Sequence, residues 1–272
     1  AHWSWDDKKG RSRASCSAPE RANDTLRLAY HGGRVQVLGT AGETVYSVRS
    51  VDRNSMYPSV MVESSMPDMD TVRECAPTAS NLIKLAADDE QVYWANVELV
   101  AGPNAELFIP VTSEDGRKSY TQTRVSGWYV EPIIDYALAH GWQLKSVSEL
   151  WFARSMKPFT DFVNEFYAIR LAYKKQGDGR EILVKLLLNS LYGKFAQRNY
   201  AERIDDPAIC AQMIEDNEWQ DEFDLHFYGN IFSHLCFFIE KEASELSRNT
   251  WFGFAAFITG YAQVSLQQVI SA

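Results

Sequence analysis

The sequence feature that most constrains this chain is an apolar, helix-forming stretch, residues 185–193, which polar residues interrupt at regular intervals. Lys185, Asn189 and Tyr192 stand at positions i, i+4 and i+7, so they share one face of an α-helix. Three consecutive leucines, at 186–188, cover the other directions. One side of the helix is therefore predicted to pack, while the other presents an ammonium group, an amide and an aromatic ring.

That polar face suits a nucleotide. An ammonium group binds phosphate, an amide binds polar edges, and an aromatic ring stacks on a sugar or a base. A buried helix whose lysine extends to the surface and whose tyrosine finds a polar partner would show the same pattern. The helix alone leaves both interpretations open.

A second stretch, further upstream, places a carboxylate at the end of an expected strand. Residues 45–51 alternate as a strand does, and Asp52 follows directly. An Asn-Ser pair and then Tyr57-Pro58 come next, in a sequence that favours a turn. A carboxylate in this position is well placed to bind a metal ion.

Together, Asp-x-x-Ser-x-Tyr-Pro at 52–58 and Lys-x-x-x-Asn-Ser-x-Tyr-Gly at 185–193 resemble motifs A and B of family B DNA polymerases, in that family's order. Tyr-x-Gly-Gly at 30–33 resembles a segment of the protein-primed members that contacts the template strand. Local rules alone make the same glycines the turn of a hairpin over residues 26–37. The resemblance covers residues 25–197 and 251–272, and it points to the protein-primed branch, or a related primer-independent one, of phages and linear plasmids.

The resemblance implies an α+β fold with an antiparallel palm sheet, flanking helices and a two-helix fingers hairpin, as an incomplete polymerase domain. The expected divisions are a linker or loop at 1–24, part of the palm with a possible insertion at 25–153, the fingers hairpin at 154–198, an acidic insertion at 199–250 and a palm helix at 251–272. Local patterns predict strands at 91–100, 107–111 and 142–153, a short helix or turn at 59–63, a turn at 115–116, a helix at 131–140 before Gly141, and two helices separated by a break at 176–179.

The resemblance also implies a role for individual residues. Asp52 would be the catalytic carboxylate and a Mg²⁺ ligand. Seven residues are expected to bind the nucleotide. Ser55, Arg170, Lys174 and Lys185 would contact the triphosphate. Asn189 would lie beside the nucleotide, Tyr57 under its sugar, and Tyr192 would face the new base pair. The residues expected to contact DNA are Tyr30, Gly32, Gly33 and Gly193. If the two fingers helices pack antiparallel, the three cations could converge into one pocket.

Nucleotidyl transfer is an in-line attack of a 3′-hydroxyl on the α-phosphate, with charge neutralised by two metal ions. Two Mg²⁺ ions about 3.5–4 Å apart normally need carboxylates from separate strands, and Asp52 supplies one. The resemblance places the second, in an Asp-Thr-Asp hairpin, after the helix expected at 251–272, and the sequence ends at Ala272. We therefore expect a fragment of the palm and fingers that does not extend a primer by itself.

The net charge of −9 argues against a nucleic-acid partner, but its distribution is uneven. Residues 154–203 hold ten basic and five acidic side chains, whereas residues 204–240 hold nine acidic ones and no Lys or Arg. The basic stretch is compatible with a phosphate-binding site, and a solvated helix surface would look similar. Four scattered cysteines, with no long apolar run, predict a reduced cytoplasmic setting and no membrane partner. The resemblance implies a bacterial host, or a protein encoded by a virus or plasmid.

The implied partners are a DNA primer-template, a dNTP and, in the protein-primed branch, a terminal protein. Two other classes of protein are also compatible with the sequence. A non-catalytic DNA-binding module, or a polymerase remnant, would bind DNA in a salt-sensitive manner whether or not Asp52 is present. An unrelated soluble α+β protein with chance motifs would bind no dNTP.

Overall fold

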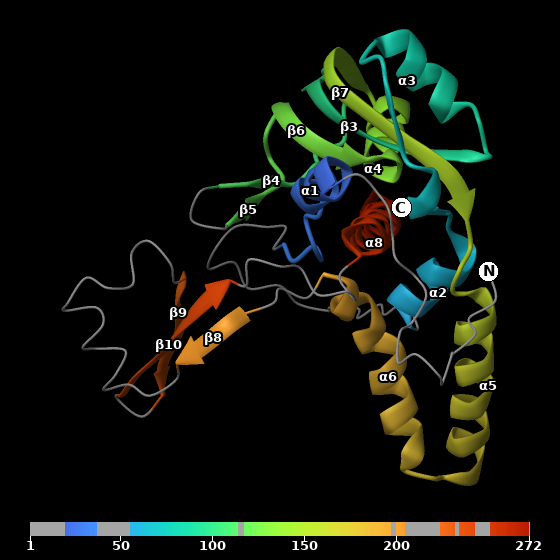
Figure 1. Ribbon diagram of the computed structural model, residues 1–272, viewed down its shortest axis with the longest axis vertical. Coiled ribbons are helices and arrows are strands. Elements are labelled where there is room, and N and C mark those ends of the chain that lie inside the picture. The colour runs from blue at the N-terminus through green and yellow to red at the C-terminus, as the bar shows by residue number, and fades with distance from the viewer. Residues whose placement is uncertain are drawn as a thin grey trace. The chain divides into compact units, whose positions relative to one another are not determined.

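Figure 1 shows a computed structural model of the 272-residue chain. The residues that the structure describes are 20–36, 55–113, 117–196, 200–204, 224–231, 234–242 and 251–271. The chain forms two units, residues 1–195 with 251–272, and residues 196–250. The larger unit contains the described residues of all three sequence motifs.

The larger unit is built on an antiparallel five-stranded sheet. Its central strand, β3 (Gln91–Ala101), pairs with β7 (Trp142–Met156) on one side and with β6 (Arg124–Val130) on the other. Two short strands, β1 (Met66–Pro67) and β2 (Arg73–Cys75), pair with β7. Residues 92–95 of β3 are all buried, so this part of the sheet is covered on both sides.

Helix α1 (Glu20–Leu28) corrects two predictions. Ala22 and Leu26, one turn apart, are fully buried, and the Trp94 indole N–H donates to Thr25 Oγ1 at 2.8 Å. These contacts with distant parts of the chain favour a helix where local rules predicted a linker up to residue 24 and a hairpin over residues 26–37. Residues 29–36 form no strand.

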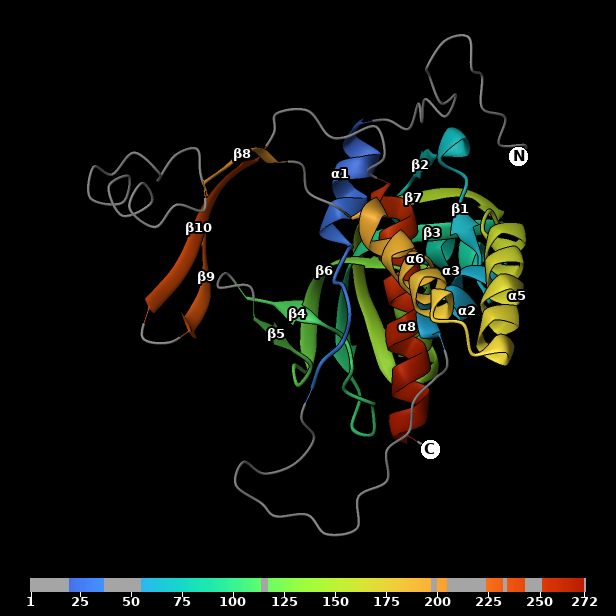
Figure 2. The ribbon, with the colours of Figure 1, turned by 90° about the horizontal axis from the view of Figure 1, so that it is seen from below.

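Helix α8 (Phe252–Ser271) is buried along most of its length. Its residues 252–260 are all buried, as expected for a helix that is apolar all round. It packs against α1, α2 (Met56–Glu63), α4 (Glu131–Ala139) and α6 (Arg180–Phe195). Figure 2 shows α8 running through the middle of this unit.

Several predicted elements are confirmed. Strands β3 and β7 and helix α4 cover the ranges expected, and α2 confirms the short helix at 59–63 with an earlier start. The described residues also form a 3₁₀ turn, η1 (Met69–Thr71), helix α3 (Ala79–Ala86) and the paired strands β4 (Val111–Thr112) and β5 (Lys118–Ser119).

The strand predicted at 107–111 is wrong except at its end. Phe108 and Ile109 are buried as an apolar run should be, but only Val111 belongs to a strand. Pro110 has no N–H and cannot donate to a sheet ladder. Its carbonyl instead accepts a hydrogen bond from the Tyr129 hydroxyl at 3.0 Å.

The two-helix hairpin is confirmed. Helix α5 (Thr160–Gln176) ends at Gly177, whose φ of +67° is left-handed, and α6 begins three residues later. The two helices lie side by side (Figure 1). Pro158 lies just before the helix, which begins at Thr160.

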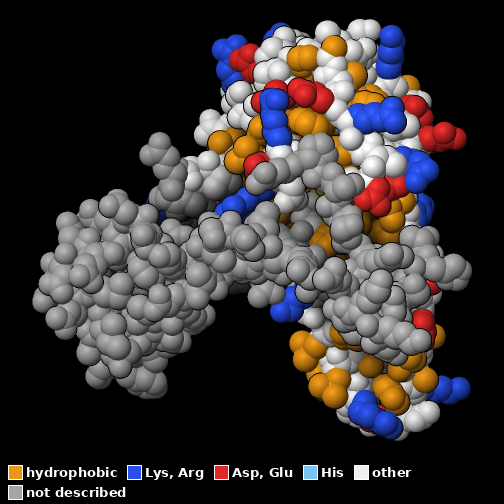
Figure 3. Space-filling view, in the orientation of Figure 1, with side chains coloured by type: hydrophobic (Ala, Val, Ile, Leu, Met, Phe, Trp, Pro, Cys, Tyr) orange, Lys and Arg blue, Asp and Glu red, His pale blue; other side chains and the backbone are white. Residues whose placement is uncertain are grey.

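The leucines of α6 pack less than predicted. Leu188 is buried, but Leu186 and Leu187 are 59% and 42% exposed. A hairpin of two helices buries only the stripe between them and the stripe at its base, so the remaining directions face outward. Figure 3 shows hydrophobic side chains on the surface of this hairpin.

The smaller unit is a three-stranded antiparallel sheet within the predicted acidic insertion. Its order is β8 (Tyr200–Ile204), β10 (His234–Glu242) and β9 (Asp224–Ile231). The strand predicted at 45–51, Asp52 and the turn predicted at 115–116 lie outside the described residues. In the described part of the chain, we find no helix with the length and apolar character that crossing a membrane requires.

We predict that Gly260→Ala destabilises the larger unit. A Cβ atom at position 260 would lie 2.6 Å from Val130 Cγ2 and 3.2 Å from Pro132 Cγ, so α8 would have to move away from β6 and α4. Overpacking of this kind costs about 1–3 kcal/mol of unfolding free energy, which a urea titration measures. Gly193→Ala, with no atom within 4 Å of the added Cβ, is the matched control and should leave stability unchanged or slightly raised. Equal effects of the two substitutions would contradict this account of α8 packing.

Candidate nucleotide and DNA site

The Tyr-x-Gly-Gly segment follows α1 and lies against two other motifs. Gly32 has a φ of +65°, a conformation that favours glycine. At Gly33, a Cβ atom would lie 3.0 Å from the Tyr57 hydroxyl oxygen, so the chain passes very close to motif A. Both glycines are therefore explained by local geometry, without reference to a hairpin turn.

A cluster of three tyrosines joins the three motifs. Tyr57, on α2, stacks on Tyr192, on α6, with ring centroids 3.9 Å apart and an angle of 24° between the planes. Burial raises the pKa of Tyr57, and a hydrogen bond with Tyr192 and the nearby Tyr30 raise it further. Burial, and then Tyr192, raise the pKa of Tyr30. The hydroxyls of Tyr57 and Tyr30 therefore stay protonated at neutral pH and can donate hydrogen bonds.

Arg170 links the fingers hairpin to the start of α2. Its Nη1 donates to Ser55 Oγ at 2.9 Å, and its Nε donates to Glu181 Oε2 at 3.2 Å. The Arg170 side chain is only 15% exposed. Ser55 itself is left-handed (φ +50°), an uncommon conformation for a residue other than glycine, and one that concentrates at functional sites.

The other predicted nucleotide-binding residues lie on the same hairpin. Lys174 and Lys185 are exposed, and among the described residues neither forms a hydrogen bond or an ion pair. Asn189 is half-buried and Gly193 is exposed. The structure thus brings together positions 30, 33, 55, 57, 170 and 192, while the common pocket for the three cations stays a prediction. Asp52 lies outside the described residues.

The sequence motifs missed a lysine that lies at the Tyr-x-Gly-Gly segment. The Lys118 ammonium, on β5, donates to the Gly33 carbonyl at 3.3 Å. Burial lowers its pKa. No local pattern could have found this contact, because 85 residues separate the two positions.

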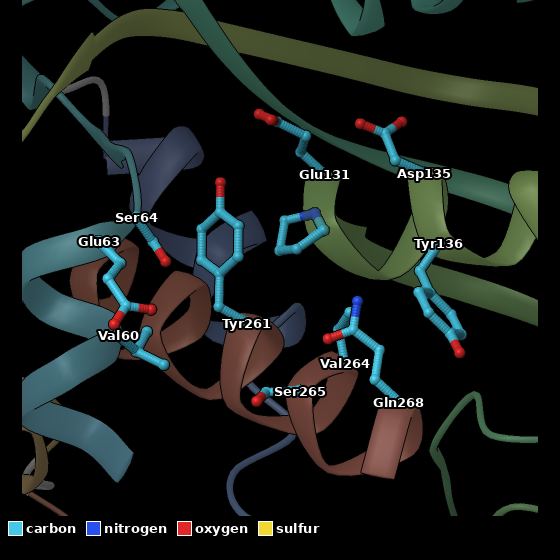
Figure 4. A pocket seen from close by; sticks show the side chains of 11 residues that line it. Val60, Glu63, Ser64, Glu131, Asp135, Tyr136, Tyr261, Val264, Ser265 and Gln268 are labelled. Atoms are coloured by element: carbon cyan, nitrogen blue, oxygen red, sulfur yellow. The ribbon is translucent and has the colours of Figure 1, made fainter. Parts of the chain in front are cut away.

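A pocket of about 370 Å³ lies elsewhere in the larger unit and contains none of the predicted site residues. Figure 4 shows Tyr261 of α8 pointing into the space between α2 and α4. The lining residues are Val60, Glu63, Ser64, Glu131, Pro132, Asp135, Tyr136, Tyr261, Val264, Ser265 and Gln268. This lining includes three acidic residues and no Lys or Arg, which disfavours a phosphate ligand. The described residues contain no group of three or more His, Cys, Asp or Glu side chains that could hold a metal ion.

Comparison with known families identifies the class of protein to which this fold and these three motifs belong. Residues 16–235 match the family described as DNA polymerase type B, organellar and viral, and the chain belongs to that family.

Individual relatives are DNA polymerases by name. The chain is 30% identical over 188 residues to the DNA-directed DNA polymerase of Enterobacteria phage PRD1, across 66% of this chain and 30% of that protein. It is 27% identical over 185 residues to a probable DNA polymerase of Ascobolus immersus, across 62% of this chain and 14% of that protein. The chain thus spans less than a third of the length of these relatives.

The fold is similar to that of Phi29 DNA polymerase. An orthorhombic crystal form of that enzyme matches with a TM-score of 0.59 and 18% identity, over 93% of this chain and 41% of that one. Its complex with primer-template DNA and incoming nucleotides matches with a TM-score of 0.55 and 16% identity, over the same shares of the two chains. The α+β fold predicted from sequence is confirmed.

We predict that Glu131 makes the larger unit less stable as the pH rises. Burial, and then the Asp135 carboxylate, raise the pKa of Glu131 to about 8, although the Tyr93 N–H donates to it. The folded protein therefore keeps a proton there that the unfolded chain releases near its ordinary value of 4.5, so stability falls between about pH 4.5 and 8.

Glu131→Gln tests this, because the amide cannot ionise and still offers an oxygen to the Tyr93 N–H. Thermal melting at a series of pH values should show equal or lower stability of the variant at pH 4.5 and higher stability at pH 8.5. Glu165→Gln, at an exposed position on α5, is the control and should follow the unmodified protein at every pH. Parallel curves for Glu131→Gln and the unmodified protein would contradict the prediction.

Proposed function

We propose that this chain is the nucleotide-binding part of a DNA-directed DNA polymerase, which adds a dNTP to a 3′-hydroxyl during DNA replication. The observation that carries the proposal is the contact of motif A with the fingers hairpin, in which Tyr57 stacks on Tyr192 of motif B and Arg170 of α5 donates to Ser55. Two motifs more than a hundred residues apart are thereby held as one surface. Family membership and the polymerase fold support this assignment.

The incoming nucleotide would bind between α2 and the hairpin. A guanidinium carries five N–H donors, and Arg170 uses only part of them on Ser55 and Glu181, so the others are available to a phosphate. Lys174 and Lys185 are exposed and would approach the triphosphate from solvent. Tyr57 would pack under the sugar and exclude a 2′-hydroxyl, and Asn189 would lie beside the nucleotide.

The metal ions would be two Mg²⁺, with Asp52 as a catalytic ligand. Asp52 comes three residues before Ser55 in the sequence, and its carboxylate is the hard oxygen donor that Mg²⁺ prefers. Bound Mg²⁺ would neutralise phosphate charge during transfer. The second carboxylate would come from the Asp-Thr-Asp hairpin that the resemblance implies for the full-length protein.

The proposed DNA contacts are Tyr30, Gly32 and Gly33 for the template strand and Gly193 near the new base pair. Gly33 and Gly193 are exposed, as a backbone that approaches DNA closely must be. The family resemblance adds a terminal protein as primer, the scattered cysteines indicate a cytoplasmic setting, and both are part of this proposal.

The first test is Asp52→Asn in the full-length natural protein. We expect Mg²⁺-dependent primer extension to fall at least about a thousandfold, because a catalytic metal contributes several kcal/mol. Affinity for primer-template DNA should stay within about twofold, since removal of this carboxylate adds no repulsion to phosphate. Asp70→Asn, at an exposed position in η1, is the control and should extend primers normally. Full activity of Asp52→Asn would rule out the metal role, and DNA binding without extension by the unmodified protein would favour a non-catalytic module.

The second test is Lys185→Gln, assayed by steady-state incorporation of one dNTP. Loss of one charge-assisted contact to phosphate should raise the KM for dNTP about tenfold. The apparent affinity for DNA should not change. Lys84→Gln, at an exposed position on α3, is the matched control. An unchanged KM in Lys185→Gln would show that the α6 lysine does not contact the nucleotide.

A further inference from the structure

Among the described residues, two cations at segment 30–36 have no acidic partner: Arg34 within the segment and Lys118 beside it. The Arg34 guanidinium donates to Gln267 Oε1 at 2.6 Å and to Gln36 Oε1 at 2.6 and 3.1 Å, and it lies 4.8 Å from the centre of the Tyr120 ring. Lys118 reaches this segment from the β4–β5 pair and donates to the Gly33 carbonyl. In the described part of the chain, all these partners are neutral, so neither positive charge is compensated.

Two side chains of helix α8 hold segment 30–36 in place through hydrogen bonds. Gln263 Nε2 donates to the Gly32 carbonyl, and Gln267, one turn further along, binds Arg34. Both glutamines are at least 95% buried. Gln267 also donates to the Glu106 carboxylate. That carboxylate accepts further hydrogen bonds from the Tyr136 and Ser271 hydroxyls. Segment 30–36 is therefore ordered before any ligand arrives, which reduces the entropy lost on binding.

The chemistry of this surface fits a phosphodiester backbone. Gly33 and Lys118 are exposed, so a ligand can reach both the glycine backbone and the ammonium group. Uncompensated cations next to an exposed glycine backbone favour a polyanion whose charges repeat along a strand. A neutral or cationic partner would leave both charges uncompensated.

We propose that Lys118 is a DNA-binding residue that contacts a phosphate of the strand lying along Gly32 and Gly33, with Arg34 as the neighbouring cation. This assigns a DNA contact to the β4–β5 pair, which belongs to none of the three sequence motifs. The inference rests on the proposed polymerase function, because that function supplies the DNA strand.

The test compares Lys118→Gln, Lys118→Arg and the unmodified full-length protein in binding a fluorescent single-stranded oligonucleotide at several salt concentrations. Each phosphate contact on a single strand contributes about 0.7 to the slope of log affinity against log salt. We expect Lys118→Gln to lose about that amount and to bind several-fold more weakly at about 0.1 M salt. Lys118→Arg keeps the charge and should retain the slope.

The matched control is Lys145→Gln, which removes an exposed lysine that donates to Gln143, on β7. It should bind DNA like the unmodified protein. The KM for dNTP and the melting temperature of Lys118→Gln should also match those of the unmodified protein. An unchanged slope would overturn the inference, and so would weaker binding that follows only from a lower melting temperature. Failure of the unmodified protein to bind DNA would instead overturn the proposed function itself.

Discussion

The burial of helix α8 is the constraint on which the rest of the larger unit depends. A helix that is apolar all round must be enclosed, and α8 is enclosed by α1, α2, α4 and α6 and by strands β1 and β6. Gly253 and Gly260 permit this close packing, because a Cβ atom at either position would lie within 3.0 Å of a neighbouring side chain. The enclosing elements are therefore held near one another.

This enclosure explains how distant residues form one site. Helix α2 carries Tyr57 and helix α6 carries Tyr192, and both helices pack against α8, so the two rings are brought into contact. On α8, Gln263 donates a hydrogen bond to the Gly32 carbonyl. The tyrosine cluster and the Tyr-x-Gly-Gly segment thus share one support, and we infer that the nucleotide and DNA contacts are positioned together.

Much of the fold could be predicted from sequence, because long elements carry a regular pattern. The helices on either side of Gly177 and the alternation along β7 are of this kind. The predictions failed where distant contacts override local preference. Leu26 belongs to a helix, in which it is buried together with Ala22. The apolar residues before Val111 are not part of the sheet, because Pro110 cannot donate to a sheet ladder. For the site, the motifs indicated Tyr57, Arg170 and Tyr192 but gave no sign of Lys118.

The sequence by itself determined which chemical groups are present and the order of their motifs. It placed an ammonium, an amide and an aromatic ring on one face of α6, because helical spacing is a local property. Only the tertiary structure decided that Tyr57 stacks on Tyr192 and that Lys118 reaches Gly33. The physical reason is range: periodicity and turn chemistry act over a few residues, whereas these contacts join segments far apart in the chain and exist only once the core around α8 has packed.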